Sequence, residues 1–172
     1  MTRSRSNSIA AGALLTALAL IFSYVEFLIP FNIGIPGVKL GIANIVVVTA
    51  LYVYNGKYAL AVNIIRIFIA GFLFSGAFGI IYSLAGGLLS FVVMILLKRT
   101  GIFSVIGVCA AAGVAHNLGQ LLTAAFLVSN LSIFVYFPLL LFSGIICGII
   151  TGFVTTLILY RLPDRIYKFP EG

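Results

Sequence analysis

FGIIYSLAGGLLSFVVMILL, residues 78–97, decides the fold class of this chain because it is a continuous apolar run without a charged residue. A helix needs about 20 such residues to cross the hydrocarbon layer of a bilayer. Lys98 and Arg99 follow immediately and end the run. Comparable runs lie on both sides, and none alternates as a barrel strand would. We therefore predict an all-α membrane protein with six transmembrane helices, at residues 9–29, 40–54, 58–74, 78–97, 102–128 and 134–160.

The composition supports the same class. Of the 172 residues, 63% are hydrophobic and only 8% are charged, which excludes an ordinary soluble domain. The net charge of +7 would point to nucleic acid in a soluble protein, but here the basic residues are spread over the helix ends. They are expected to meet lipid headgroups instead, and we expect no nucleic-acid partner. No linker divides the chain, so we expect a single integral membrane domain over residues 1–172.

The basic residues also predict the topology. Eight of the ten lie at every second boundary between the predicted spans: Arg3, Arg5, Lys57, Lys98, Arg99, Arg161, Arg165 and Lys168. Cytoplasmic loops carry such an excess, so both termini are predicted to be cytoplasmic, in the inner membrane of a bacterium. The first run is longer than the apolar region of a usual signal peptide, and we expect it to be retained.

Two basic residues depart from this pattern and are candidates for function. Lys39 lies at an opposite boundary, and Arg66 lies inside the third predicted span, one helical turn after Asn63. Ionisable residues inside a membrane are costly and commonly functional. Glu26 is the only acidic residue within a predicted span, so a structural Glu26–Arg66 ion pair is one interpretation. In the other, Arg66 and Lys39 give an outward-facing cavity a positive potential that favours an anionic ligand.

The fifth predicted span carries a second polar group, formed by His116, Asn117, Gln120 and Thr123. Their spacing places them near one helical stripe, where they would contact a ligand or bond neighbouring helices. The three acidic residues are far apart, and no P-loop or metal-ligand spacing is present. We therefore expect no catalytic activity, no cofactor and no metal site.

Two further segments predict contacts. The loop between the first two spans, with Phe31, Asn32 and Pro36, mixes apolar side chains with prolines and glycines. We expect it to fold back onto the protein; the alternative is a loop resting on the lipid interface. Ala13 and Ala17 form a small-xxx-small pair near the inner end of the first span. Such a pair docks either another helix of this chain or a partner subunit.

Residues 36–44 (PGVKLGIAN), the intramembrane stretch 63–66 (NIIR) and the glycine-rich fourth span resemble the Gx transporter family. This family is also called heptaprenyl diphosphate synthase component I, and the resemblance extends from about Ile9 to Tyr160. The family is in turn similar to the substrate-binding S components of energy-coupling factor (ECF) transporters. Those are six-helix membrane proteins that capture vitamins from outside and associate with a transmembrane coupling subunit and cytoplasmic ATPases.

The resemblance implies a role for several segments. The loop with Phe31, Asn32 and Pro36 would cover the substrate pocket, and Ala13 and Ala17 would meet the coupling subunit. The outer parts of the last three helices would line the pocket and bring in Tyr82, Asn117, Gln120 and Tyr136. The synthase name fits less well, because the chain lacks the aspartate-rich magnesium motifs of prenyl transferases.

We therefore expect a substrate-binding subunit that captures an anionic or amphipathic organic ligand from the extracellular side. The ligand would be related to isoprenoids or quinones, or would be flavin- or vitamin-like. The alternative is a non-catalytic membrane subunit for prenyl diphosphate or quinone synthesis, or for flavin-based extracellular electron transfer. The predicted binding residues are Lys39, Asn44, Asn63, Arg66, Tyr82, His116, Asn117, Gln120 and Tyr136.

Overall fold

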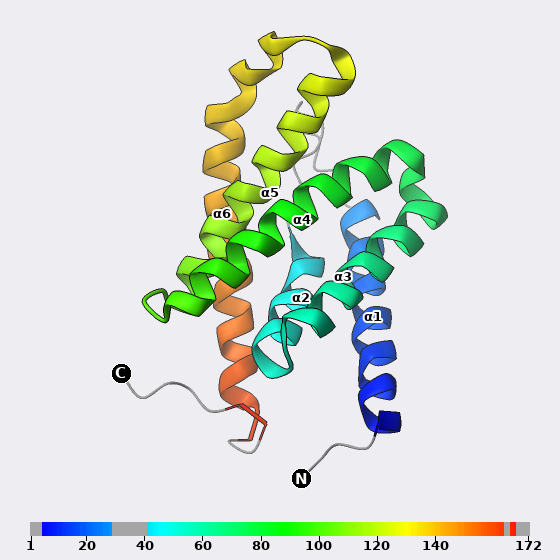
Figure 1. Cartoon of the computed structure of the whole chain (residues 1–172), viewed down its shortest axis with the longest axis vertical. Helices are drawn as coiled ribbons and strands as arrows, with labels where there is room; N and C mark the ends of the chain where they lie inside the picture. Colours follow the sequence, from blue (N-terminus) through cyan, green and yellow to red (C-terminus); the bar gives the residue numbers. More distant parts are fainter. Residues whose placement is uncertain (1–4, 29–40, 164–165, 168–172) are drawn as a thin grey trace.

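A computed structural model describes residues 5–28, 41–163 and 166–167, and every regular element within them is helical. This confirms the predicted all-helical class (Figure 1). The α-helices are α1 (Arg5–Leu28), α2 (Ile42–Val53), α3 (Gly56–Ala70), α4 (Gly76–Thr100), α5 (Val105–Val128) and α6 (Phe137–Arg161). A π-helix, η1 (Gly71–Ser75), precedes α4, and a 3-10 helix, η2 (Leu131–Tyr136), precedes α6.

The helix ends follow local sequence signals. The side chain of Asn55 accepts a hydrogen bond from the backbone nitrogen of Tyr58 at 2.9 Å, so it caps the start of α3. Helix α4 continues beyond its apolar run, through Lys98 and Arg99 to Thr100. Gly101 then ends the helix with a φ of 69°, a conformation that favours glycine.

The described helices support a multi-pass membrane protein. Four helical stretches are long and apolar enough to cross a bilayer: Ile9–Leu28, Gly56–Thr100, Val105–Val128 and Leu131–Arg161. Helix α2 has 12 residues, or about 18 Å, which is shorter than the roughly 30 Å of a hydrocarbon layer. The count of six complete crossings and the orientation of the termini therefore stay predictions.

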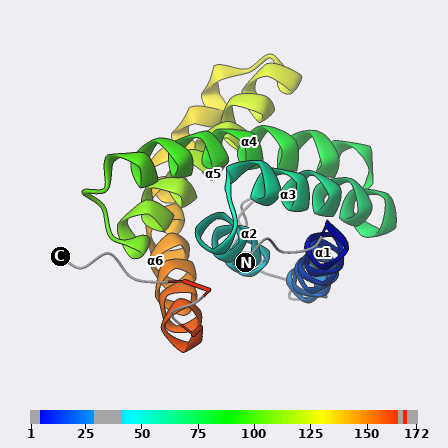
Figure 2. The same ribbon diagram turned by 60° about the horizontal axis from the view of Figure 1, so that its bottom comes forward.

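The longest apolar stretch, Gly56–Thr100, is a hairpin of α3 and α4, which lie side by side (Figures 1 and 2). The reversal occurs at η1 and at Gly76, whose φ is 69°. A Cβ atom at Gly71 would overlap the side chain of Ile80, so the two arms approach closely only because this residue is glycine. The hairpin places the C-terminal end of α3 beside the N-terminal end of α4.

Helices α5 and α6 form an extensive pair that depends on small residues. Gly144, Gly148 and Gly152 of α6 face the backbone of α5. A Cβ atom at Gly148 would lie 2.6 Å from the Cα of Ala110, and one at Gly144 would lie 2.8 Å from the carbonyl oxygen of Gly113. Close backbone approach of this kind is the usual role of small-residue ladders between membrane helices.

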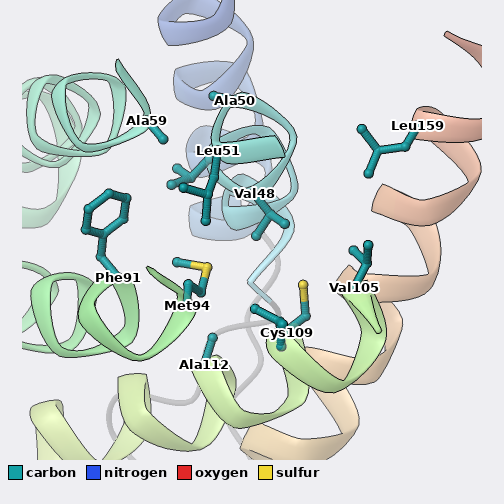
Figure 3. Packing of buried hydrophobic residues seen from close by; sticks show 12 residues of the cluster. Val48, Ala50, Leu51, Ala59, Phe91, Met94, Val105, Cys109, Ala112 and Leu159 are labelled. Atoms are coloured by element: carbon teal, nitrogen blue, oxygen red, sulfur yellow. The ribbon is translucent and has the colours of Figure 1, made fainter. Parts of the chain in front are cut away.

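The hydrophobic core lies at one end of the bundle, around the short helix α2 (Figure 3). Leu51 of α2 is buried there with Phe91 of α4 and Leu159 of α6. Lys98 donates a hydrogen bond to the carbonyl oxygen of Leu51 at 2.6 Å, and its ammonium group lies 4.6 Å from the ring centre of Tyr52. The end of the bundle that carries Lys98 is therefore closely packed.

Candidate functional site

The opposite end of the bundle carries an open cavity of about 550 Å³, which we call the large cavity. Its walls come from the C-terminal ends of α1 and α5, from η1 and η2, and from the N-terminal parts of α4 and α6. Most of the lining side chains are apolar, among them Phe74, Leu121, Ile133 and Leu140. Both the volume and the mainly apolar wall are typical of sites for organic ligands.

Four polar residues of the large cavity are those that the resemblance implied: Tyr82, Asn117, Gln120 and Tyr136. The amide nitrogen of Asn117 donates to the carbonyl oxygen of Leu140 at 2.7 Å and to the hydroxyl of Ser143 at 3.1 Å. Asn117 therefore ties α5 to α6 and also lines the cavity. The structure brings these four residues together, and their contact with a ligand stays a prediction.

Arg66 lines a second, smaller cavity of about 70 Å³, which we call the Arg66 cavity. Its side chain is 9% exposed, and its two terminal nitrogens donate to Ser23 Oγ at 3.3 Å and to Asn63 Oδ1 at 2.7 Å. The spacing of Asn63 and Arg66 thus produces a direct hydrogen bond. The Nε of Arg66 is buried and has no acceptor within the described residues.

Glu26 lies on the same small cavity as Arg66 and attracts its guanidinium electrostatically. One carboxylate oxygen of Glu26 also accepts a hydrogen bond of 2.6 Å from the backbone nitrogen of Ile42, at the start of α2. Arg66 therefore has an acidic neighbour and an adjacent cavity, and the choice between its two predicted roles stays open.

The two cavities are neighbours that share part of one wall. Phe27, Phe74, Ser75 and Gly79 line both. The ring centres of Phe27 and Phe74 are 5.5 Å apart, and Tyr24 packs against Phe74 at 5.7 Å. Aromatic side chains and one short hydroxyl side chain therefore separate the polar Arg66 cavity from the mainly apolar large cavity.

The remaining predicted binding residues lie elsewhere. His116 and Asn44 line a third cavity of about 40 Å³ between α2, α4, α5 and α6, which Asn117 also borders. The hydroxyl of Thr123 donates to the carbonyl oxygen of Gly119 in its own helix at 2.9 Å. The polar stripe predicted on α5 is therefore divided between two cavities and a local hydrogen bond. Within the described part of the chain, no group of three or more metal-ligating side chains is present.

Two further predictions concern the loop after α1 and the exposed face of α1. Lys39 and the loop residues Phe31, Asn32 and Pro36 lie outside the described residues. Ala13 and Ala17 are exposed on α1, beside Leu14, which is 72% exposed. This face of α1 is not covered by the other described helices.

The residues that line both cavities could not be predicted from the sequence. Phe27, Phe74, Ser75 and Gly79 stand at helix ends, where nothing in the sequence indicates that they meet. The place of Ser23 beside Glu26 could have been predicted, because Ser23 lies one helical turn before Glu26 on the same face of α1.

Comparison with known proteins identifies the family. The sequence model of one protein family, described as Heptaprenyl diphosphate synthase component I, matches residues 15–158, which is most of the chain. No curated protein and no solved structure matches significantly. The similarity to S components of ECF transporters stays a prediction. From residue 15 to residue 158, covering all the cavities described above, the chain belongs to the heptaprenyl diphosphate synthase component I family.

Proposed function

We propose that this protein is a membrane-embedded substrate-binding subunit of an ECF-type transporter, which captures an amphipathic organic ligand. The large cavity is the observation that carries the proposal, because about 550 Å³ of mainly apolar space suits a drug-sized or isoprenoid-like molecule. Tyr82, Gln120 and Tyr136 offer hydrogen bonds on a mainly apolar wall, which would orient the ligand. We propose a binding role rather than a catalytic one.

The position of the large cavity favours capture from outside. Lys57, Lys98 and Arg161 lie at the beginning of α3 and at the ends of α4 and α6, whereas the cavity lies at the other ends of these helices. If the basic ends face the cytoplasm, as the positive-inside rule predicts, the cavity faces the extracellular side. The packed core around α2 would then close the cytoplasmic side.

The energy for transport would come from partner subunits. The exposed face of α1 with Ala13 and Ala17 would dock a transmembrane coupling subunit, which in turn would bind cytoplasmic ATPases. Small residues allow a partner helix to approach closely, so their exposure is consistent with such a contact.

Replacing Ala13 and Ala17 together by Leu is expected to abolish co-purification of the coupling subunit, because the larger side chains would hold its helix away. The measurement is affinity purification from the native membrane, followed by mass spectrometry of the bound subunits. Ala77→Leu, at an exposed alanine at the opposite end of the bundle, is the control and should leave the partners unchanged. Unchanged association in the double variant would refute this interface.

Ala124→Phe tests the cavity directly. Ala124 lines the large cavity, so a phenyl ring there should occupy ligand space and lower the amount of co-purifying ligand at least about tenfold. The ligand is extracted from the purified protein and quantified by mass spectrometry. Leu122→Phe is the matched control, because Leu122 lies on the exposed side of the same helix. Equal ligand content in both variants would contradict binding in this cavity.

The family name favours a second candidate, a non-catalytic membrane subunit of a prenyl diphosphate synthase. The large cavity would then hold the growing apolar chain of a product made by a partner enzyme. The two candidates differ in what co-purifies. ATPases and a coupling subunit support the transporter, whereas a prenyl transferase supports the synthase.

A further inference from the structure

We infer that the Arg66 cavity is the head-group half of the ligand site, and that it selects a neutral, carbonyl-bearing head rather than a phosphate or diphosphate. The inference rests on the proposed binding of a ligand in the large cavity. It adds the chemical class of the head group and the residues that select it.

The first observation is that the two cavities are adjacent. The two cavities share Phe27, Phe74, Ser75 and Gly79, so a molecule that fills the large cavity ends against the wall of the Arg66 cavity. The large cavity is lined mainly by apolar side chains, whereas Ser23, Glu26, Arg66 and Ser83 border the small one. An amphipathic ligand matches this division, with its tail in the large cavity and its head against the wall that the two cavities share.

The second observation is an unused donor. Ser23 and Asn63 accept hydrogen bonds from the two terminal nitrogens of Arg66, but the buried Nε has no acceptor in the described structure. A buried polar group without a partner is costly and is normally satisfied by another atom. A carbonyl oxygen that enters the Arg66 cavity would accept this hydrogen bond.

The third observation is the charge balance. Arg66 and Glu26 border the same cavity, so their formal charges cancel. A phosphate there would place a second acidic group beside one guanidinium, in an environment of low dielectric constant where like charges repel strongly. A carbonyl group adds an acceptor without adding charge. The Glu26 carboxylate therefore acts as the selective element against anions.

The fourth observation is size. A cavity of about 70 Å³ accommodates a single functional group or a few water molecules. One carbonyl group of a larger head fits there, whereas a diphosphate needs more cationic partners than the single guanidinium that borders this cavity among the described residues. Within the described residues, no cluster of acidic and histidine side chains is available to hold a metal ion for it.

Three probes with the same geranylgeranyl tail test the inference: a methylnaphthoquinone carrying the tail, the tail diphosphate, and the tail as a plain hydrocarbon. Their dissociation constants are measured with the purified full-length protein in one detergent. Comparing variants for the same probe cancels the partition of that probe into micelles.

Arg66→Met should weaken binding of the naphthoquinone about tenfold, because the donor is lost, and should leave binding of the hydrocarbon unchanged. Glu26→Gln keeps an oxygen acceptor for the backbone nitrogen of Ile42 but removes the negative charge. It should strengthen binding of the diphosphate at least about tenfold and change binding of the naphthoquinone less than about threefold. If Arg66→Met does not fold, the affinities of Glu26→Gln for the diphosphate and the naphthoquinone test the inference.

Each outcome has one meaning. If neither variant changes the preference among the heads, while Ala124→Phe weakens all three probes, the capture function stands and the head-group inference is overturned. If the wild-type protein prefers the diphosphate, and Arg66→Met weakens that probe most, the site is an anion site and the inference is wrong. If no probe binds the wild-type protein, both proposals fall. If water, and not a ligand, accepts the hydrogen bond from Arg66 Nε, Arg66→Met leaves the affinities of all three probes unchanged. This result also overturns the inference.

Discussion

Asn63→Leu is expected to destabilise the folded protein by about 3 kcal/mol, because it removes an acceptor from a buried charge. Asn63 is 2% exposed, and its Oδ1 accepts a hydrogen bond from Arg66 Nη2 at 2.7 Å. Leucine has a similar branched shape and is larger, so the change removes the hydrogen bond without opening a cavity. Arg66 would keep Ser23 as its partner, with two of its nitrogens then lacking an acceptor. The measurement is unfolding of the purified protein in mixed micelles by increasing SDS, followed by circular dichroism.

The double variant Asn63→Leu, Arg66→Met is the control for this interpretation. Removing both partners of a buried hydrogen bond costs less than removing one, because no donor of Arg66 is left without its acceptor, while the Glu26 carboxylate loses its counter-charge. The double variant should therefore recover part of the stability that Asn63→Leu loses. Additive losses in the double variant would show that Asn63 stabilises the helix through packing and not through Arg66.

Gly148→Ala is expected to destabilise the protein by about 2 kcal/mol through overpacking between α5 and α6. The new Cβ atom would lie 2.6 Å from the Cα of Ala110 and closer still to the carbonyl oxygen of Cys109. Backbone atoms cannot move aside as a flexible side chain can, so the two helices would have to separate. Thermal unfolding in detergent, followed by circular dichroism, measures the effect.

Gly107→Ala is the matched control on α5. The nearest atom to a Cβ there is the hydroxyl oxygen of Ser104 at 3.6 Å, an ordinary van der Waals contact. Because alanine is the better helix former, this variant should be neutral or stabilised by up to about 1 kcal/mol. A loss of stability equal to that of Gly148→Ala would show that the α5–α6 contact does not depend on the missing Cβ atom.

The candidate site was predictable to different extents at different residues. Arg66 is conspicuous as a charge inside an apolar run, and its spacing from Asn63 places both on one helical face. Tyr82 and Tyr136 were implied only through a resemblance, and the structure places them on the large cavity with Gln120. Phe27 and Phe74 carry no local signal, because an aromatic residue near a helix end is unremarkable in a membrane protein.

The sequence by itself determined that the chain is helical and apolar, and the approximate place of each helix along it. These properties follow from the length of each apolar run and from the polar and glycine residues between them, which act locally. Only the tertiary structure decided that Arg66 opens on a small cavity, separate from the large one and beside Glu26. That separation depends on the reversal at η1, which brings Phe74 beside Phe27 of α1, a residue far away in the sequence. Such contacts depend on shape at atomic distances, and periodicity along the chain does not contain that information.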